Sequence, residues 1–127
     1  MRETIQDEET TIWWVFFDLL PIALEAHKAN DKDRLKNIYA LAEWCHQQRR
    51  QAPELWKAAY AAFYEHLIDD EAAFEAIPYW VPPEIFHDMR DEFERRIEIL
   101  EGSGRWEKGK FQELLAKYNQ VNGTEFN

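Results

Sequence analysis

Large apolar side chains recur every three or four residues along most of this chain of 127 residues, which is the spacing of a helix that buries one face. The pattern predicts a first helix over residues 12–26, a second over 35–45 with Asn30 and Asp31 as candidate N-caps, and a third over 56–67 with Pro53 in its first turn. A long helix over 83–102 and a last one over 111–118 complete the pattern. We therefore expect an all-α fold, a compact bundle of about five helices.

Prolines mark where this pattern is interrupted. Pro21 lacks a backbone donor, so a kink or a break is expected in the first helix. Asp70 suits the N-cap of a brief helix that ends near Ile77. The apolar residues 77–83 include three of the five prolines, and we expect a stiff connection that lies against the core.

The sequence does not decide the local structure of two segments. Residues 10–17 are rich in β-branched and aromatic side chains, so a strand is a real alternative to a helix there. Residues 121–127 carry little apolar pattern and predict a frayed tail. The length fits a single helical domain over residues 1–127.

Composition indicates a folded protein of a reducing compartment. Hydrophobic residues make up 46% of the chain and include six Trp and eight Phe, which is too many for a disordered acidic chain. The one cysteine, Cys45, excludes an internal disulfide and falls on an apolar stripe. Residues 1–10 do not resemble a signal peptide, and the apolar region 12–26 is too short to span a bilayer. We expect a cytoplasmic protein.

The charge is negative and unevenly distributed. Fifteen basic and 25 acidic residues give a net charge of -10, which disfavours binding to nucleic acid or to an anionic membrane. Residues 69–101 hold eleven acidic and three basic residues. This segment is either a solvated face with interspersed arginines or an electrostatic docking surface for a basic protein. On the second interpretation the aromatic anchors would be Tyr79 and Trp80, and the charged contacts Asp69, Asp70, Glu71, Asp88, Asp91 and Glu92.

Catalytic and metal-binding patterns are weak. Glu43 and His46 have a spacing that puts a carboxylate and an imidazole on one helix face, but Glu65 and His66 are adjacent and point about 100° apart around a helix. We interpret these four as polar structural residues and expect no metal and no cofactor. The lone serine, Ser103, sits in a Gly-Ser-Gly turn without a base, so we expect no enzyme.

Several blocks of the chain carry a resemblance to a known family. They are Ala42-Glu43-Trp44-Cys45, Trp56-Lys57-Ala58-Ala59, Ala62-Phe63-Tyr64-Glu65-His66-Leu67 and Trp80-Val81-Pro82-Pro83-Glu84-Ile85-Phe86. Over residues 35–116 the chain resembles a family of small, uncharacterised, all-helical bacterial proteins, and the Phe-Tyr-Glu-His-Leu block is the most specific part. The resemblance implies no activity. By analogy, small acidic proteins of this kind are often immunity or antitoxin partners.

These observations favour a non-enzymatic protein-binding module, in concrete form an immunity or antitoxin-type protein that neutralises a basic toxin such as a nuclease. A metal-binding helical protein or enzyme that uses His46 and His66 is one alternative. A structural homo-oligomer, in its simplest form a homodimer, is another, because six Trp exceed what a small core is expected to hide.

Overall fold

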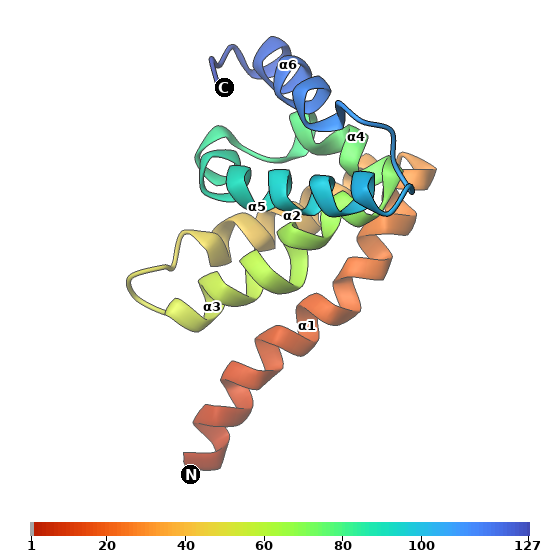
Figure 1. Ribbon diagram of the computed structural model, residues 1–127. Coiled ribbons are helices and arrows are strands. Elements are labelled where there is room, and N and C mark those ends of the chain that lie inside the picture. Colours follow the sequence, from red (N-terminus) through yellow and green to blue (C-terminus); the bar gives the residue numbers. More distant parts are fainter. Residues whose placement is uncertain (1) are drawn as a thin grey trace. The chain divides into compact units, whose positions relative to one another are not determined.

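The computed structural model describes residues 2–127, with side chains from Thr11 onward, and the described part is all-α without a strand (Figure 1). Two compact units divide the chain, an N-terminal unit that ends at Leu67 and a C-terminal unit over Ile68–Asn127. The described elements are α1 (Arg2–Ala29), α2 (Lys32–His46), α3 (Pro53–Ala58), the π-helical η1 (Ala59–Phe63), the 3-10 helix η2 (Tyr64–Asp69), α4 (Glu71–Trp80), α5 (Pro83–Gly102) and α6 (Lys110–Asn122). None of these helices is long and apolar enough to cross a membrane.

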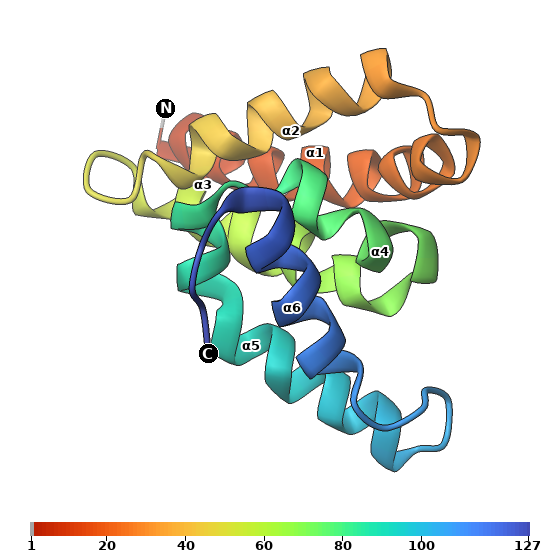
Figure 2. The same ribbon diagram turned by 90° about the horizontal axis from the view of Figure 1, so that it is seen from above.

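In the N-terminal unit, α1 packs against α2, α3 and η1, and Figure 2 shows α1 and α2 side by side. Aromatic rings fill the space between these helices. Phe16 and Tyr39 each lie against Phe63, with ring centroids 5.8 and 5.3 Å apart. All three side chains are almost fully buried, so the aromatic content that the sequence showed is used to form this core.

The first helix is not broken at Pro21, so of the two expected outcomes, a kink or a break, the break is wrong. Residues 10–17 are helical, so the strand alternative is wrong, and α1 runs through Pro21 to Ala29. Pro21 lies on the exposed face, and Phe17, whose carbonyl loses its helical donor, is 46% exposed. Water can therefore reach the group that proline leaves unbonded, which explains why the helix tolerates the ring.

Two helix starts agree with the sequence, and the third predicted helix does not stay regular. The Asp31 carboxylate caps α2 by accepting from the Arg34 backbone N–H at 3.2 Å, and Pro53 opens α3. From Ala59 the chain widens into the π-helical turn and then tightens into the 3-10 helix. Residues 62–64 are all fully buried there, which a helix with a single buried face would not achieve.

The C-terminal unit begins with the Asp70 cap that the sequence predicted, since its carboxylate accepts from the Ala73 N–H at 3.1 Å. The expected connection over residues 77–83 is largely helical instead. Pro78 is buried inside α4, which continues to Trp80, and only residues 81 and 82 separate α4 from α5. A proline so near the end of a helix removes one hydrogen bond, and its burial offsets that loss.

The segment that we expected to fray is folded back. α6 extends to Asn122, and Gly123 ends it in the left-handed conformation with φ of 66°. The Asn119 side chain then accepts from the Phe126 N–H and donates to its carbonyl, both at 2.8 Å, and it also accepts from the Thr124 hydroxyl. One asparagine side chain thus bonds three polar groups of the tail.

A stack of aromatic rings joins α5, α6 and this tail. Phe86 and Tyr118 stack with centroids 3.8 Å apart, and the Phe126 ring lies 5.1 Å from Phe86. The Tyr118 hydroxyl donates to the Val81 carbonyl at 2.5 Å, so it also holds the connection between α4 and α5. The core of the C-terminal unit therefore depends on residues that are far apart in the sequence.

Replacing Tyr118 by Phe should lower the free energy of unfolding by about 1–2 kcal/mol, because it leaves the buried Val81 carbonyl without its donor. Tyr64→Phe is the matched control. Its hydroxyl is buried without a hydrogen-bond partner among the described residues, so its loss should cost nothing or should stabilise. Urea denaturation of both variants measures the difference, and equal losses in the two would contradict the assignment.

Candidate functional site

The acidic residues singled out in the sequence have different roles in the structure. Asp70 is used as the cap of α4, where its carboxylate is partly buried. Glu92, with a side chain only 15% exposed, accepts from Arg95 at 2.9 and 2.5 Å and lies 3.6 Å from Arg96. Arg96 also pairs with Asp69 at 3.5 Å. Asp70 therefore stabilises the start of α4, Glu92 is neutralised by arginines of its own helix, and the pair of Asp69 with Arg96 joins η2 to α5.

Asp88 and Asp91 instead lie on the exposed face of α5, and the Asp91 side chain is 95% exposed. Two exposed acids that sequence reasoning missed, Glu84 and Glu98, lie on the same face. Positions 84, 88, 91 and 98 are spaced by four, three and seven residues, so they lie on one face of the helix, and the exposed Arg95 lies on that same face between Asp91 and Glu98. We call these four residues the acidic stripe. Their helical spacing was the signal that could have identified it.

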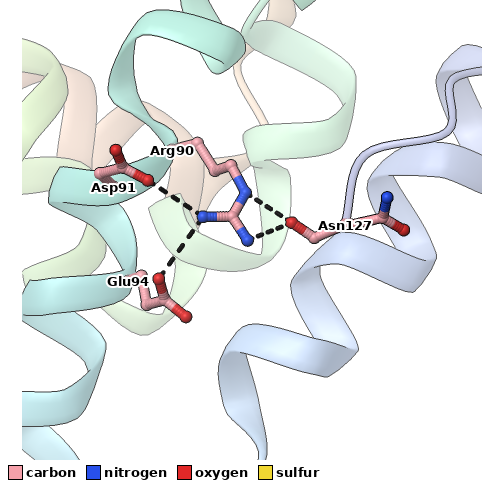
Figure 3. Close-up of polar contacts among 4 residues, drawn as sticks. All are labelled: Arg90, Asp91, Glu94 and Asn127. Carbon is pink, nitrogen blue, oxygen red and sulfur yellow. Dashed lines mark hydrogen bonds and ion pairs between the residues drawn. The ribbon is translucent and has the colours of Figure 1, made fainter.

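Arg90 on α5 has a structural role (Figure 3). Its guanidinium donates to Asp91 at 3.0 Å and to Glu94 at 3.4 Å, and its Nε donates to the Asn127 carbonyl at 2.6 Å. The same group lies 5.0 Å from the Phe111 ring centroid. Arg90 thus connects α5, α6 and the folded-back tail, and it also pairs with the exposed Asp91.

The expected aromatic anchors differ in exposure. Tyr79 is 61% exposed on the last turn of α4, with the Lys117 ammonium 5.6 Å from its ring centroid, whereas Trp80 is half-buried. Glu71 is exposed in the first turn of α4. Tyr79 can therefore contact a partner with most of its ring, and Trp80 with only part of it.

Glu71 also borders a feature that sequence reasoning missed. Two adjoining hollows of about 300 and 290 Å³ lie between α4 and α6 and share Phe74 and Lys110. Trp106 closes the first against Phe74, with ring centroids 4.8 Å apart. The linings mix acidic and basic side chains, so the hollows favour no particular charge. No sequence pattern indicates them, because they arise from the packing of α4 on α6.

The two Glu–His pairs of the N-terminal unit do not form a metal site. His46 is buried with its ring 6.3 Å from Trp56 and 6.2 Å from Tyr64, whereas Glu65 and His66 are half-buried on the 3-10 helix. Within the part of the chain whose side chains are described, no group of three or more His, Cys, Asp or Glu residues could hold a metal ion. His46 packs as a polar member of an aromatic core.

Burial raises the pKa values of three groups around His46. Desolvation raises the pKa of the Glu43 carboxyl and that of the fully buried Cys45 thiol. Burial first, and then the nearby Glu43 carboxylate, raise the pKa of Tyr64 well above its usual value. A thiol without access to solvent is a poor nucleophile, so Cys45 contributes packing rather than chemistry.

Comparison with protein-family models matches residues 1–98 to a domain of unknown function, DUF7674, and the chain belongs to this family. The resemblance noted in the sequence is confirmed at that level, although the matched range begins and ends earlier than the expected 35–116. No curated protein and no solved structure is found to match. The matched range includes the acidic stripe, whereas α6 lies beyond it.

Glu43→Gln should make the protein more stable at neutral pH. Because folding raises the pKa of this carboxyl, the folded chain binds the proton more readily than the unfolded one. Stability is then highest below the ordinary Glu pKa of about 4.3 and falls as the pH rises through the raised value. Thermal melting against pH should show this fall in the native protein and not in the variant.

Glu125→Gln, on the exposed tail, is the control for losing one negative charge. Its melting temperatures should follow those of the native protein across the whole range. Melting curves of Glu43→Gln that run parallel to the native ones at every pH would show that burial of Glu43 does not matter.

Proposed function

We propose that this member of a family of unknown function is a non-enzymatic protein-binding module, and that the acidic stripe of α5 binds a basic protein partner. The observation that supports this proposal is that four carboxylates are exposed along one face of a single helix. They are Glu84, Asp88, Asp91 and Glu98. Exposed charges of one sign steer an oppositely charged protein and reject partners of the same sign.

The arginines of α5 leave this face negative. The helix carries seven acidic and three basic residues. Arg90 pairs with Asp91 of the stripe as well as with the tail, and Arg96 pairs with Asp69 and Glu92. Arg95, which is exposed on the face of the stripe, is held by Glu92. The face therefore holds four carboxylates and one arginine, Arg95, while Arg90 pairs with Asp91 from the side. The excess of negative charge on this face supports a docking surface for a basic protein.

Tyr79 is the proposed aromatic contact of this module. It is exposed at the end of α4, one short connection before α5 begins. Tyrosine supplies a large contact area with few rotatable bonds and a hydroxyl for the polar rim, which is why it recurs at binding hot spots. Trp80 would contribute less, because it is half-buried before any partner binds.

In its concrete form the proposal is an immunity or antitoxin-type protein that acts in a reducing compartment such as the cytoplasm. A toxin that cleaves nucleic acid needs clustered Lys and Arg to hold phosphates, and a stripe of carboxylates can occupy that same surface. Simple occlusion neutralises such a toxin without any catalytic group on the binder. The buried, unpaired thiol of Cys45 fits a reducing compartment.

The double substitution Asp88→Lys with Asp91→Lys should weaken binding at least tenfold, mainly through slower association, because it places two positive charges in the centre of the stripe. The partner is captured from the native host, purified, and titrated calorimetrically at low and at high salt. Glu113→Lys with Glu125→Lys changes the net charge equally on α6 and the tail, away from the stripe, and should leave the affinity within about twofold.

Native binding that does not weaken as salt is raised would contradict the electrostatic docking surface. Equal losses for the two double variants would show that only net charge matters, and an unchanged affinity after the Asp88 and Asp91 substitutions would remove the stripe from the interface. Each of these results tests the role of α5 in binding and says nothing about the other helices.

A further inference from the structure

Asn122 and Gly123 form the one Asn-Gly pair of the sequence, and they lie at the end of α6. In such a pair the backbone nitrogen of the glycine can attack the side-chain carbonyl carbon of the asparagine, because glycine has no side chain to hinder the approach. The glycine is needed here because it ends α6 in the left-handed conformation, with φ of 66°. The helix end therefore places a chemically reactive pair at this position.

The Asn122 side chain also has a structural role where α6 packs on α4 (Figure 2). Its Nδ2 donates to the Pro78 carbonyl at 2.9 Å and to the Tyr118 carbonyl at 3.1 Å. The helical donor for the Pro78 carbonyl would be the N–H of residue 82, but residue 82 is a proline, which has no N–H. Asn122 therefore supplies the donor that the chain after α4 lacks.

We propose that Asn122 is a site of spontaneous deamidation that the folded chain restrains. In this reaction a bond forms between the Gly123 nitrogen and the Asn122 Cγ, and the bond from Cγ to Nδ2 breaks. The side-chain nitrogen leaves as ammonia and takes the proton of the Gly123 N–H with it. Water then opens the five-membered imide that has formed, so that residue 122 becomes aspartate or isoaspartate.

Three hydrogen bonds hold the reacting groups in the folded chain. The two carbonyls that accept from the Asn122 Nδ2 use both of its hydrogens and fix the carboxamide group. The Gly123 N–H, which must lose its proton during the attack, donates to the Asn119 carbonyl at 2.9 Å. The reaction therefore proceeds when the last turn of α6 opens, and helix ends open by local unfolding.

The product of the reaction cannot take over the structural role of Asn122. A carboxylate has no donor, so the carbonyls of the buried Pro78 and of Tyr118 would face negative oxygens instead of an N–H. The lost hydrogen bonds and the repulsion both weaken the contact between α6 and α4. Deamidation thus releases the end of α6 from α4. This inference concerns the C-terminal unit and does not depend on the proposed function.

Mass spectrometry of the whole chain during incubation at mildly alkaline pH tests the site and its restraint, with fragmentation to locate each converted asparagine. In urea, where the chain is unfolded, Asn122 should convert before Asn37, whose neighbour Ile38 hinders the same attack. In the folded chain the conversion of Asn122 should be slower by about tenfold or more, because it waits for local opening. Equal rates in the two states, or a different asparagine that converts first in urea, overturns the proposal.

Phe126→Ala tests where the chain must open. The Phe126 ring packs on Phe86 with centroids 5.1 Å apart and anchors the tail, so its loss should free the last turn of α6 and raise the conversion rate of Asn122 several-fold. Phe17→Ala, which removes an exposed ring from α1 in the N-terminal unit, should leave this rate unchanged. Circular dichroism confirms that both variants keep their helices. A native rate in Phe126→Ala would overturn the assignment of the restraint to this helix end.

Asn122→Asp reproduces one product of the reaction and tests its structural effect. Its melting temperature should fall by several degrees, and by more than that of Asn122→Ala, which removes the donor without adding a charge. Asn37→Asp, on the exposed face of α2, adds the same charge elsewhere and should melt close to the native chain. An Asn122→Asp variant as stable as Asn37→Asp would overturn the conclusion that deamidation releases α6 from α4.

Discussion

Tyr118 is the side chain on which the C-terminal unit depends most. Its ring stacks on Phe86 of α5, its edge meets Phe126 of the tail, and its hydroxyl holds the carbonyl of Val81 between α4 and α5. A single residue of α6 therefore ties together four segments. The tail is held because Phe126 completes this stack and because the Asn119 side chain satisfies the backbone that returns toward it.

The acidic residues of 69–101 have separate structural and surface roles, although the sequence presents them as one run. The Asp70 carboxylate caps the start of α4, and the Glu92 carboxylate pairs with arginines of its own helix, α5. Asp88 and Asp91 project from the same helix as Glu92, but on its exposed face. A docking role can therefore be assigned to the second pair without loss of the structural roles of the first.

α1 carries large apolar side chains on two faces. Phe16 and Ala23 pack into the N-terminal unit, while Trp14 and Phe17 remain exposed on the other side. Six tryptophans in a small chain suggested that one core could not hide them all, and the outer face of α1 accounts for part of that surplus.

The sequence by itself determined what depends on a few neighbouring residues. Apolar spacing of three and four indicated an all-α chain, and Asp31, Asp70 and Pro83 indicated where helices begin, because caps and first-turn prolines act within one turn. Tertiary structure decided the rest: that Pro78 could stay inside α4, that the third predicted helix would change into π and 3-10 turns, and that the tail would fold back. It also decided that Asp69 pairs with Arg96, because these two residues are 27 positions apart in the sequence and meet only when the chain is folded.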